Sequence, residues 1–332
     1  SSTGWFSGNA VLADSRLVDP NHSPDHRKQK MRYYQYIQGG TRHVAVEADP
    51  GQIRNLTALN PRIASTLDLL RAASITGSDI DSVTRGILSA NPGPATISIE
   101  ELLDGAAPGK HGVTLLPPID APEVWAFGVT YMDSMRERQA ESGSPDVYAK
   151  VYDAERPEAF FKSTLDRLQS PFAEVGIRAD SEWNVPEPEL SFVTYDGKIV
   201  GYTCGNDMSS RTIEGENPLY LPQAKVYDKS AALGPALATP ETVGDPQKLG
   251  VTLVIERDGN EAFKGEANTS EMKRDCAYLV DWLVRHNSIP DGTSVMTGTG
   301  TIPPPEFTLA AGDVIHVTIE KIGTLTNTVV VV

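Results

Sequence analysis

The chain has 332 residues, 39% of them hydrophobic and 22% charged, which is the composition of a folded globular protein and excludes a largely disordered one. Its formal net charge of −15 argues against nucleic acid and anionic membranes as partners, because both repel an acidic protein. Its two cysteines exclude a disulfide framework and a cysteine metal cluster, and with no apolar run long enough to span a bilayer we expect a cytoplasmic protein.

The N-terminal part of the chain predicts a polar extension followed by a small domain. Residues 1–30 are polar and irregular, and MRYYQYIQGGTRHVAVE, which starts at Met31, predicts two strands around the Gly39-Gly40 turn. Apolar residues recur at helical spacing in IASTLDLLRAAS, so residues 31–112 are expected to form a small α+β domain. The Gly- and Pro-rich residues 104–123 mark the boundary with a second domain, residues 113–332.

The second domain is rich in short β-like runs, namely EVWAFGV, ELSFVTY, KIVGYTC, LGVTLVIERDG, DVIHVTIEKIG and NTVVVV. One amphipathic helix, SEMKRDCAYLVDWLVRH, interrupts them, and Thr269 or Ser270 is its expected N-cap. Because strands outnumber helices and do not alternate with them, we predict an α+β, mainly β fold rather than a doubly wound parallel sheet.

Two glutamates one residue apart open a strand in the stretch WNVPEPELSFV. Residues i and i+2 share one face of a strand, so Glu187 and Glu189 point the same way. Asp196-Gly197 predicts a hairpin turn, and the returning strand KIVGYTCGND ends at Asp207. A two-residue turn would place Asp207 on the opposite face, whereas a three-residue loop or an equivalent bulge places it across from Glu187.

The side-chain pattern favours the second register, in which a three-residue loop or an equivalent bulge adds one residue to the hairpin. That register gives the hairpin one acidic face and one apolar face, the latter made of Leu190, Phe192, Val200, Tyr202 and Cys204. Like charges at close range are unfavourable unless they are protonated or share a cation, and oxygen ligands select a hard ion. We therefore interpret the three carboxylates as ligands for Mg²⁺, with Mn²⁺ or Ca²⁺ also compatible; the alternative is a solvated acidic face on an edge strand.

The same residues resemble a known family. The E-x-E pair, GNDMSSR, NPLYLPQAK, a late TGT and the final IGTL look like the fumarylacetoacetate hydrolase superfamily, from about Met31 to the carboxyl end. Longer stretches, ERPEAFFKS, RADSEWNVPEPEL and EGENPLYLPQAKVYD, resemble its branch of 2-keto-3-deoxy-D-arabinonate and 2-keto-3-deoxyxylonate dehydratases. The resemblance implies a mixed β-sandwich roll as catalytic domain behind a small α+β N-terminal domain, a Mg²⁺ or similar ion, and a homodimer or homotetramer.

The resemblance also implies roles for single residues. Its metal ligands correspond to the same three carboxylates as the hairpin pattern. Glu158 in RPEAFFK corresponds to the catalytic glutamate, Lys225 in PQAK to the active-site lysine, and Thr299 in TGTGT to the threonine that contacts substrate. Further candidates for substrate binding are Lys162, Thr297 and Arg136. The stretch around Arg136, SMRERQAES, belongs either to a lid over the anionic substrate or to a solvent-facing helix.

One departure from the superfamily pattern bears on the reaction. Its hydrolases carry Y-x-x-H-x-x-E, whose His and Glu activate water, whereas YMDSMRE has Ser134 in the histidine position and keeps only Glu137. Elimination of water is therefore favoured over attack by water. We predict a metal-dependent dehydratase that converts a small anionic keto acid, a 2-keto-3-deoxypentonate, to 2-oxoglutarate semialdehyde (2,5-dioxopentanoate) in oxidative pentose degradation, with Glu158 as the base at C3.

Two alternatives stay open at this point. The first is a C–C bond hydrolase of acylpyruvates or 2,4-diketo acids, in which Glu137 or a distant residue activates water. The second is a non-catalytic, metal-stabilised binding protein.

Overall fold

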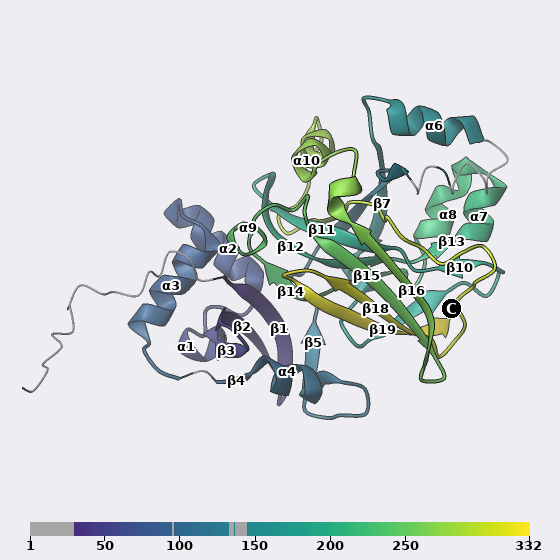
Figure 1. The fold of residues 1–332 in the computed structure, drawn as a ribbon. Helices are drawn as coiled ribbons and strands as arrows, with labels where there is room; N and C mark the ends of the chain where they lie inside the picture. Colours follow the sequence, from purple (N-terminus) through teal and green to yellow (C-terminus); the bar gives the residue numbers. More distant parts are fainter. Residues whose placement is uncertain (1–29, 95, 133–135, 137–144) are drawn as a thin grey trace, which may run out of the picture.

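A computed structural model describes residues 30–94, 96–132, 136 and 145–332, and most of its strands belong to two sheets (Figure 1). The larger sheet contains β1 (Arg32–Gln38), β2 (Thr41–Asp49), β3 (Gln52–Asn55), β4 (Ile97–Ser98), β5 (Val113–Leu116), β6 (Glu123–Gly128), β7 (Glu158–Thr164), β8 (Leu168–Gln169), β11 (Pro188–Tyr195), β12 (Lys198–Asp207), β14 (Ala231–Ala238) and β17 (Ser294–Met296). The smaller sheet contains β9 (Glu174–Ile177), β15 (Gly250–Arg257), β16 (Asn260–Asn268), β18 (Val314–Ile319) and β19 (Gly323–Val331). A separate pair is formed by β10 (Asn184–Val185) and β13 (Ser209–Ser210).

The described helices are short and lie around these sheets (Figure 1). The α-helices are α1 (Leu56–Leu59), α2 (Thr66–Thr76), α3 (Ile80–Ala90), α4 (Ile99–Ala106), α6 (Pro145–Asp153), α7 (Arg211–Glu216), α8 (Leu221–Lys225), α9 (Pro240–Val243) and α10 (Cys276–Val284). The 3₁₀ turns are η2 (Leu165–Arg167), η3 (Pro218–Tyr220) and η4 (Thr269–Glu271).

The strand order shows a mainly antiparallel architecture. The larger sheet runs β4-β3-β2-β1-β14-β12-β11-β17-β6-β7, with β5 added on β1 and β8 on β14, and the smaller sheet runs β16-β15-β18-β19-β9. Within the described strands the parallel pairs are β8 with β14, β6 with β17 and β9 with β19. The predicted α+β, mainly β class is therefore confirmed.

The two sheets pack against each other over the main hydrophobic core. Leu190, Phe192 and Tyr202 point into it from the larger sheet, and Leu253 and Val317 point into it from the smaller one. Alternate residues of β18 are buried, since a strand that faces a core on one side buries every second side chain. This sandwich fixes β11 and β12, whose ends carry the carboxylates considered below.

A second core joins the N-terminal elements to the larger sheet. Tyr33, Val46 and Leu69 pack there with Leu237 and Met296. Strand β1 hydrogen-bonds to β2 and β5, and also to β14. Residues on both sides of the predicted boundary at residue 112 thus share a sheet and a core, and the division into two domains stays a prediction.

Two N-terminal predictions are confirmed. β1 and β2 flank the Gly39-Gly40 turn, where both glycines have positive φ, 57° and 77°, a backbone conformation that suits glycine. The helix predicted from IASTLDLLRAAS is α2, which begins after Ser65 with a capping box. Residues 1–29 of the predicted extension lie outside the described residues.

The predicted cap of the helix in SEMKRDCAYLVDWLVRH is wrong. Helix α10 begins after Asp275, whose side chain accepts a hydrogen bond from the Tyr278 N–H at 2.7 Å. The hydroxyl of Thr269 instead accepts from the Leu249 N–H at 2.9 Å, and residues Thr269–Glu271 form η4. A long-range contact therefore uses the side chain that local reasoning assigned to the helix start.

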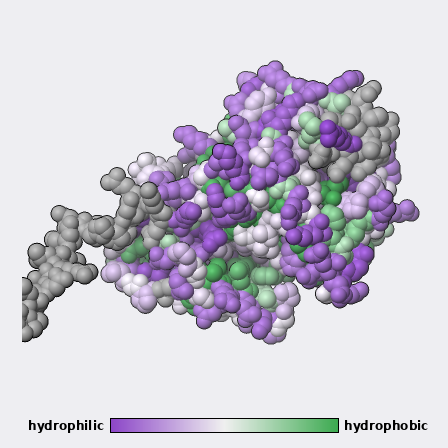
Figure 2. Space-filling view, in the orientation of Figure 1, coloured by the Kyte–Doolittle hydropathy of each residue, from purple (hydrophilic) through white to green (hydrophobic). Residues whose placement is uncertain are grey.

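The surface agrees with the acidic composition. On the face drawn in Figure 2, hydrophilic residues cover most of the area and apolar patches are small. No helix in the described part of the chain is long and apolar enough to cross a bilayer.

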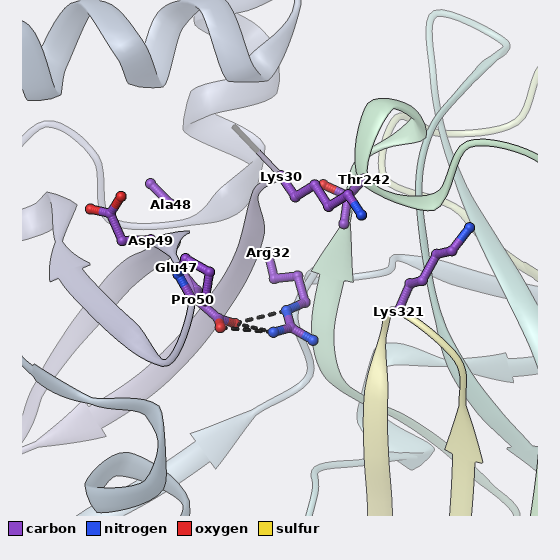
Figure 3. A pocket seen from close by; sticks show the side chains of 8 residues that line it. All are labelled: Lys30, Arg32, Glu47, Ala48, Asp49, Pro50, Thr242 and Lys321. Carbon is purple, nitrogen blue, oxygen red and sulfur yellow. Dashed lines mark hydrogen bonds and ion pairs between the residues drawn. The ribbon is translucent and has the colours of Figure 1, made fainter. Parts of the chain in front are cut away.

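A cavity of about 400 Å³ lies between the β1–β2 hairpin and the side chains of Thr242 and Lys321 (Figure 3). At its edge Arg32 and Glu47 form a two-point ion pair, with both N–O distances at 2.7 Å. The cavity is therefore lined by charges of both signs, and the charges of Arg32 and Glu47 neutralise each other.

Candidate active site

The β11–β12 hairpin closes with the turn Asp196-Gly197, in which both residues have positive φ, 50° and 67°. This is a two-residue turn of the kind that Asp-Gly favours, so the predicted three-residue loop is wrong. The pairing shifts three residues later and leaves Val200 as a bulge, which supplies the additional residue and confirms the equivalent alternative. Beyond the bulge Glu189 faces Gly205, as the carboxylate pattern requires. Val200 itself packs towards the second core, and not on the apolar face where we expected it.

Three carboxylates meet at the far end of this hairpin. Glu187, Glu189 and Asp207 each offer an oxygen within 4.8 Å of the others, and the residues are only 2%, 2% and 1% exposed. The backbone N–H of Asp207 donates to the Glu187 carbonyl at 3.0 Å, which holds the two strand ends together. Glu189 accepts a hydrogen bond from the Gly298 N–H at 2.6 Å. The alternative of a solvated acidic face is wrong, because these side chains are buried.

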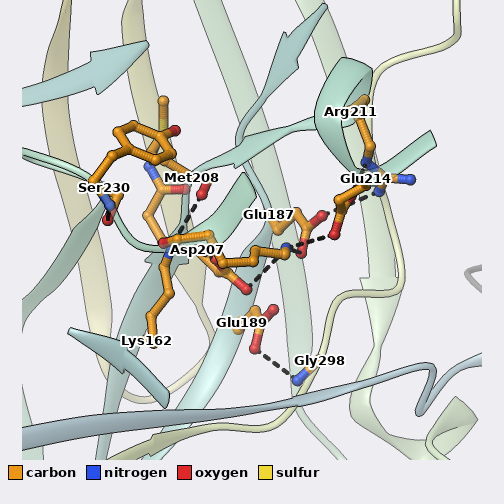
Figure 4. A network of polar contacts seen from close by, with 12 residues as sticks. Lys162, Glu187, Glu189, Asp207, Met208, Arg211, Glu214, Ser230 and Gly298 are labelled. Carbon is orange, nitrogen blue, oxygen red and sulfur yellow. Dashed lines mark hydrogen bonds and ion pairs between the residues drawn. The ribbon is translucent and has the colours of Figure 1, made fainter. Parts of the chain in front are cut away.

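Buried cations surround the carboxylates (Figure 4). Lys225 Nζ lies 2.7 Å from Glu187 Oε2 and 3.1 Å from Asp207 Oδ2. Lys162 Nζ lies 2.7 Å from Asp207 Oδ1, and Arg211 Nη2 lies 3.1 Å from Glu187 Oε1. Ion pairs of this kind are favourable only when both partners stay in place, since removing one leaves an uncompensated buried charge.

The electrostatics of the cluster favour a further cation. Burial and the charges of Asp207 and Glu187 raise the pKa of Glu189 well above its usual range, against a smaller opposite effect of Lys225. Burial lowers the pKa of Lys162, against the attraction of Asp207. A divalent ion among the carboxylates would relieve their repulsion and favour ionised Glu189. Because the donor set is all oxygen and close together, the three carboxylates could hold a metal ion such as Mg²⁺.

A narrow cavity opens onto these carboxylates, and its wall includes Glu158, Lys225 and Thr299. Glu158 is the first residue of β7 and pairs with Gly128 of β6. A Cβ at residue 128 would stand only 2.1 Å from Glu158 Oε2, so the Glu158 carboxylate lies over the glycine backbone. The cavity thus combines one further carboxylate with a cation and a hydroxyl beside the metal-ligand candidates.

Comparison with known proteins decides the family. Residues 123–330 match the family model described as fumarylacetoacetate (FAA) hydrolase, C-terminal. The chain belongs to the fumarylacetoacetate hydrolase family. A probable 2-keto-3-deoxyxylonate dehydratase of Haloferax volcanii is 44% identical over 302 residues, which cover 91% of this chain and 100% of the relative. The 2-dehydro-3-deoxy-D-arabinonate dehydratase of Saccharolobus solfataricus is 43% identical over 221 residues, or 65% of this chain and 74% of the relative.

A solved structure extends the likeness to three dimensions. The structure described as 2-keto-3-deoxy-D-arabinonate dehydratase complexed with magnesium and 2,5-dioxopentanoate superimposes with a TM-score of 0.74 at 34% identity. The match covers 91% of this chain and 99% of that one. The predicted fumarylacetoacetate hydrolase-like fold is therefore confirmed.

In this fumarylacetoacetate hydrolase family member, two predicted substrate residues lie behind the cavity wall. Lys162 is fully buried, and its Nζ also donates to the carbonyls of Met208, at 2.8 Å, and Lys225. Thr297 is likewise fully buried, and its hydroxyl donates to the Leu190 carbonyl at 2.8 Å. Neither lines the cavity, and the role of both residues in substrate binding stays a prediction.

The remaining predicted residue, Arg136, is exposed and helical, and both interpretations of its segment stay predictions. Ser134, where the chain departs from the predicted hydrolase pattern, and Glu137, which that pattern keeps, lie outside the described residues.

The sequence interpretation missed two buried residues of α7. Arg211 Nε lies 3.5 Å from Glu214 Oε2, and Glu214 Oε1 lies 3.6 Å from Lys225 Nζ, so both side chains join the charge network around the carboxylates. The side chain of Ser210, the last residue of β13, caps this helix three residues after Asp207. Their spacing could have indicated this pair, because residues i and i+3 after a serine N-cap lie on the same face of a helix.

Proposed function

We propose that this protein is a Mg²⁺-dependent dehydratase that converts a 2-keto-3-deoxypentonate of the D-arabinonate or D-xylonate type to 2,5-dioxopentanoate. The observation that carries the proposal is the buried trio of Glu187, Glu189 and Asp207 with the Glu158 carboxylate beside it, over Gly128. The names of the two curated relatives support the reaction, and the magnesium and 2,5-dioxopentanoate in the similar solved structure support the ion and the product.

The trio would hold Mg²⁺, which would act as a Lewis acid on the keto acid and make its C3 proton more acidic. Glu158 accepts that proton as general base. The protonated Glu158 then gives the proton to the C4 hydroxyl, which leaves as water while a C3–C4 double bond forms. A proton moves from C5 to C3, and the resulting C4–C5 enol tautomerises to the C5 aldehyde.

Lys225 and Thr299 bind and orient the substrate. An acidic protein with a net charge of −15 needs local cations to attract an anionic keto acid, and Lys225 is such a cation on the cavity wall. Thr299 lines the same cavity and offers a hydroxyl to the substrate. Burial strengthens both interactions, since the local dielectric constant is lower than in water. The expected homodimer or homotetramer stays a prediction.

The test is incubation of the protein and Mg²⁺ with D- and L-2-keto-3-deoxypentonate, followed by detection of 2,5-dioxopentanoate. Formation that EDTA abolishes is the expected result. No product from either compound, together with cleavage of a 2,4-diketo acid, would refute the dehydratase in favour of the hydrolase. Keto-acid binding without any turnover would instead indicate a binding protein.

A control variant separates the chemistry from the metal. Glu158→Gln keeps the size of the side chain and removes the base, so we expect loss of turnover with unchanged Mg²⁺ binding by calorimetry. Full activity of this variant would refute only the role of Glu158.

A further inference from the structure

One arginine outside the candidate active site caps the C-terminal end of helix α6. Arg274 is only 6% exposed, and its Nη2 donates to carbonyl oxygens at this helix end: those of Val151 and Tyr152, each at 3.1 Å, and that of Ala154. The last carbonyls of a helix have no partner inside it, and a cation is favourable there. Arg274 therefore acts as a C-terminal cap that the helix does not supply itself.

Neighbouring side chains hold the same segment, and Figure 1 shows α6 and α10 at the same end of the molecule. Lys273 Nζ donates to the Tyr152 carbonyl at 2.7 Å and to Asp153 Oδ1 at 2.9 Å. The Tyr278 hydroxyl donates to the Glu155 carbonyl at 2.5 Å. The guanidinium of Arg156 lies over the Trp282 ring, 4.6 Å from its centroid. We call the four side chains that hold this segment the clasp: Lys273, Arg274, Tyr278 and Trp282.

The clasp is also tied to the neighbouring strand. The backbone N–H of Lys273 donates to the Thr130 carbonyl at 3.0 Å, and Tyr131 forms a bridge with Met272. Thr130 closely follows β6, the strand that carries Gly128. The clasp thus links the residues that follow β6 to the residues that precede β7. These two segments adjoin Gly128 and Glu158, which pair with each other in the sheet.

We propose that Arg274 is a positioning residue for Glu158. Sheet pairing of β7 begins at Glu158, after the connection of residues 129–157, so contacts outside the sheet hold the residues directly before it. The Ala154 carbonyl, four residues earlier, is the last point that Arg274 fixes. Without these hydrogen bonds the chain before β7 gains freedom, and the carboxylate leaves its place over Gly128. The catalytic consequence rests on the proposed dehydration.

The test compares three variants. Arg274→Met keeps an unbranched, mainly aliphatic side chain and removes the donors. Arg274→Lys keeps the positive charge and replaces the planar guanidinium by a single ammonium group. Arg285→Met is the control. Arg285 stacks on the Trp282 ring at 3.9 Å and pairs with Asp281, both on α10, so its loss leaves the carbonyl contacts of Arg274 intact.

We expect R274M to lower kcat about 10²-fold, because a misplacement of about 1 Å at a reacting group has an effect of this size. KM and Mg²⁺ affinity should stay at the wild-type values, R274K should recover part of kcat, and R285M should match wild type. Hydrogen exchange in peptides that cover residues 150–158 should accelerate in R274M and not in R285M.

A wild-type kcat in R274M would overturn the proposal, as would unchanged exchange in residues 150–158. A crystal structure of R274M reads the geometry directly, and a Glu158 carboxylate still over Gly128 would also overturn it. If the wild-type protein forms no 2,5-dioxopentanoate, the proposed function fails, while the crystal structure and the exchange rates still decide the positioning. Should R274M fail to fold, R274K carries the same comparisons.

Discussion

Replacing Gly128 with alanine would place a methyl group where the Glu158 carboxylate now lies. The Cβ would stand 2.1 Å from Glu158 Oε2 and 2.8 Å from its Cδ. Carbon and oxygen atoms that touch are about 3.3 Å apart even in a weak C–H···O contact, so the carboxylate must move by about 1 Å or more. Since a reacting group displaced by about 1 Å loses about 10²-fold in rate, we expect kcat of G128A to fall by about that factor.

The stability of G128A should change little. The atoms that clash belong to the flexible end of a side chain, and a side chain forced from its rotamer loses about 0.5–1.5 kcal/mol. Alanine restricts the unfolded chain and contributes about 0.4–1 kcal/mol in the opposite direction. The two effects nearly cancel, so the melting temperature should shift by no more than about 4 °C.

The assay is Mg²⁺-dependent formation of 2,5-dioxopentanoate, with kcat and KM measured separately. Gly250→Ala is the matched control, because Gly250 also lies in a strand and the nearest atom to its added Cβ, Glu320 Oε2, is 4.0 Å away. Wild-type kcat in G128A would refute the placement of Glu158 over Gly128. An equal loss in G250A would show that the effect is not specific to this site.

Three further changes test the metal site, a buried acid and the core. Mg²⁺ at about 100 times its Kd should stabilise the wild-type protein by about 2.7 kcal/mol in urea unfolding, and Asp207→Asn should lose most of this difference; equal stabilisation would count against the site. Burial raises the pKa of Asp81 to about 6, so the folded state binds this proton more tightly than the unfolded state, and stability should fall as pH rises from about 4 to about 6. The rise in pKa corresponds to a loss of roughly 3 kcal/mol in the free energy of unfolding. Asp81→Asn should remove this loss when the free energy of unfolding is measured by urea titration at both pH values. A loss of the same size in the variant would contradict the role of Asp81. Leu279 in α10 is fully buried, so Leu279→Ala should lower the free energy of unfolding by about 2–5 kcal/mol in the same urea assay. A smaller loss would indicate that the neighbouring side chains move in to fill the cavity.

The metal-ligand candidates could be predicted because one register decides the faces of both strands. The apolar alternation of β11 and β12 requires an additional residue, and this residue brings Asp207 to the side of Glu187. Its location could not be predicted, since a loop and a bulge restore the same register. The turn at Asp196-Gly197 satisfies its local preference, and Val200 takes the additional position instead.

The charge network around the carboxylates could not be predicted from the sequence, for a different reason. Lysine and arginine are mostly exposed in proteins, so the pattern gave no sign that Lys162 and Arg211 are buried. Lys162 is the unpaired residue where the β6–β7 register shifts between Phe161 and Ser163, and such a bulge redirects a side chain without a mark in the sequence. Long-range geometry, not local preference, therefore pairs the Lys162 ammonium with Asp207.

The pairing of β1 with β14 matters for anyone who wishes to study the segment 123–330 by itself. In the whole chain β1 hydrogen-bonds to part of the β14 edge, and Tyr33 packs with Leu237 in the second core. A fragment that begins at residue 123 would present that edge and its apolar neighbours to other molecules. Uncovered strand edges of this kind template intermolecular pairing, so such a fragment should aggregate during expression. The N-terminal strands thus protect the edge of the sheet that carries the metal-ligand candidates.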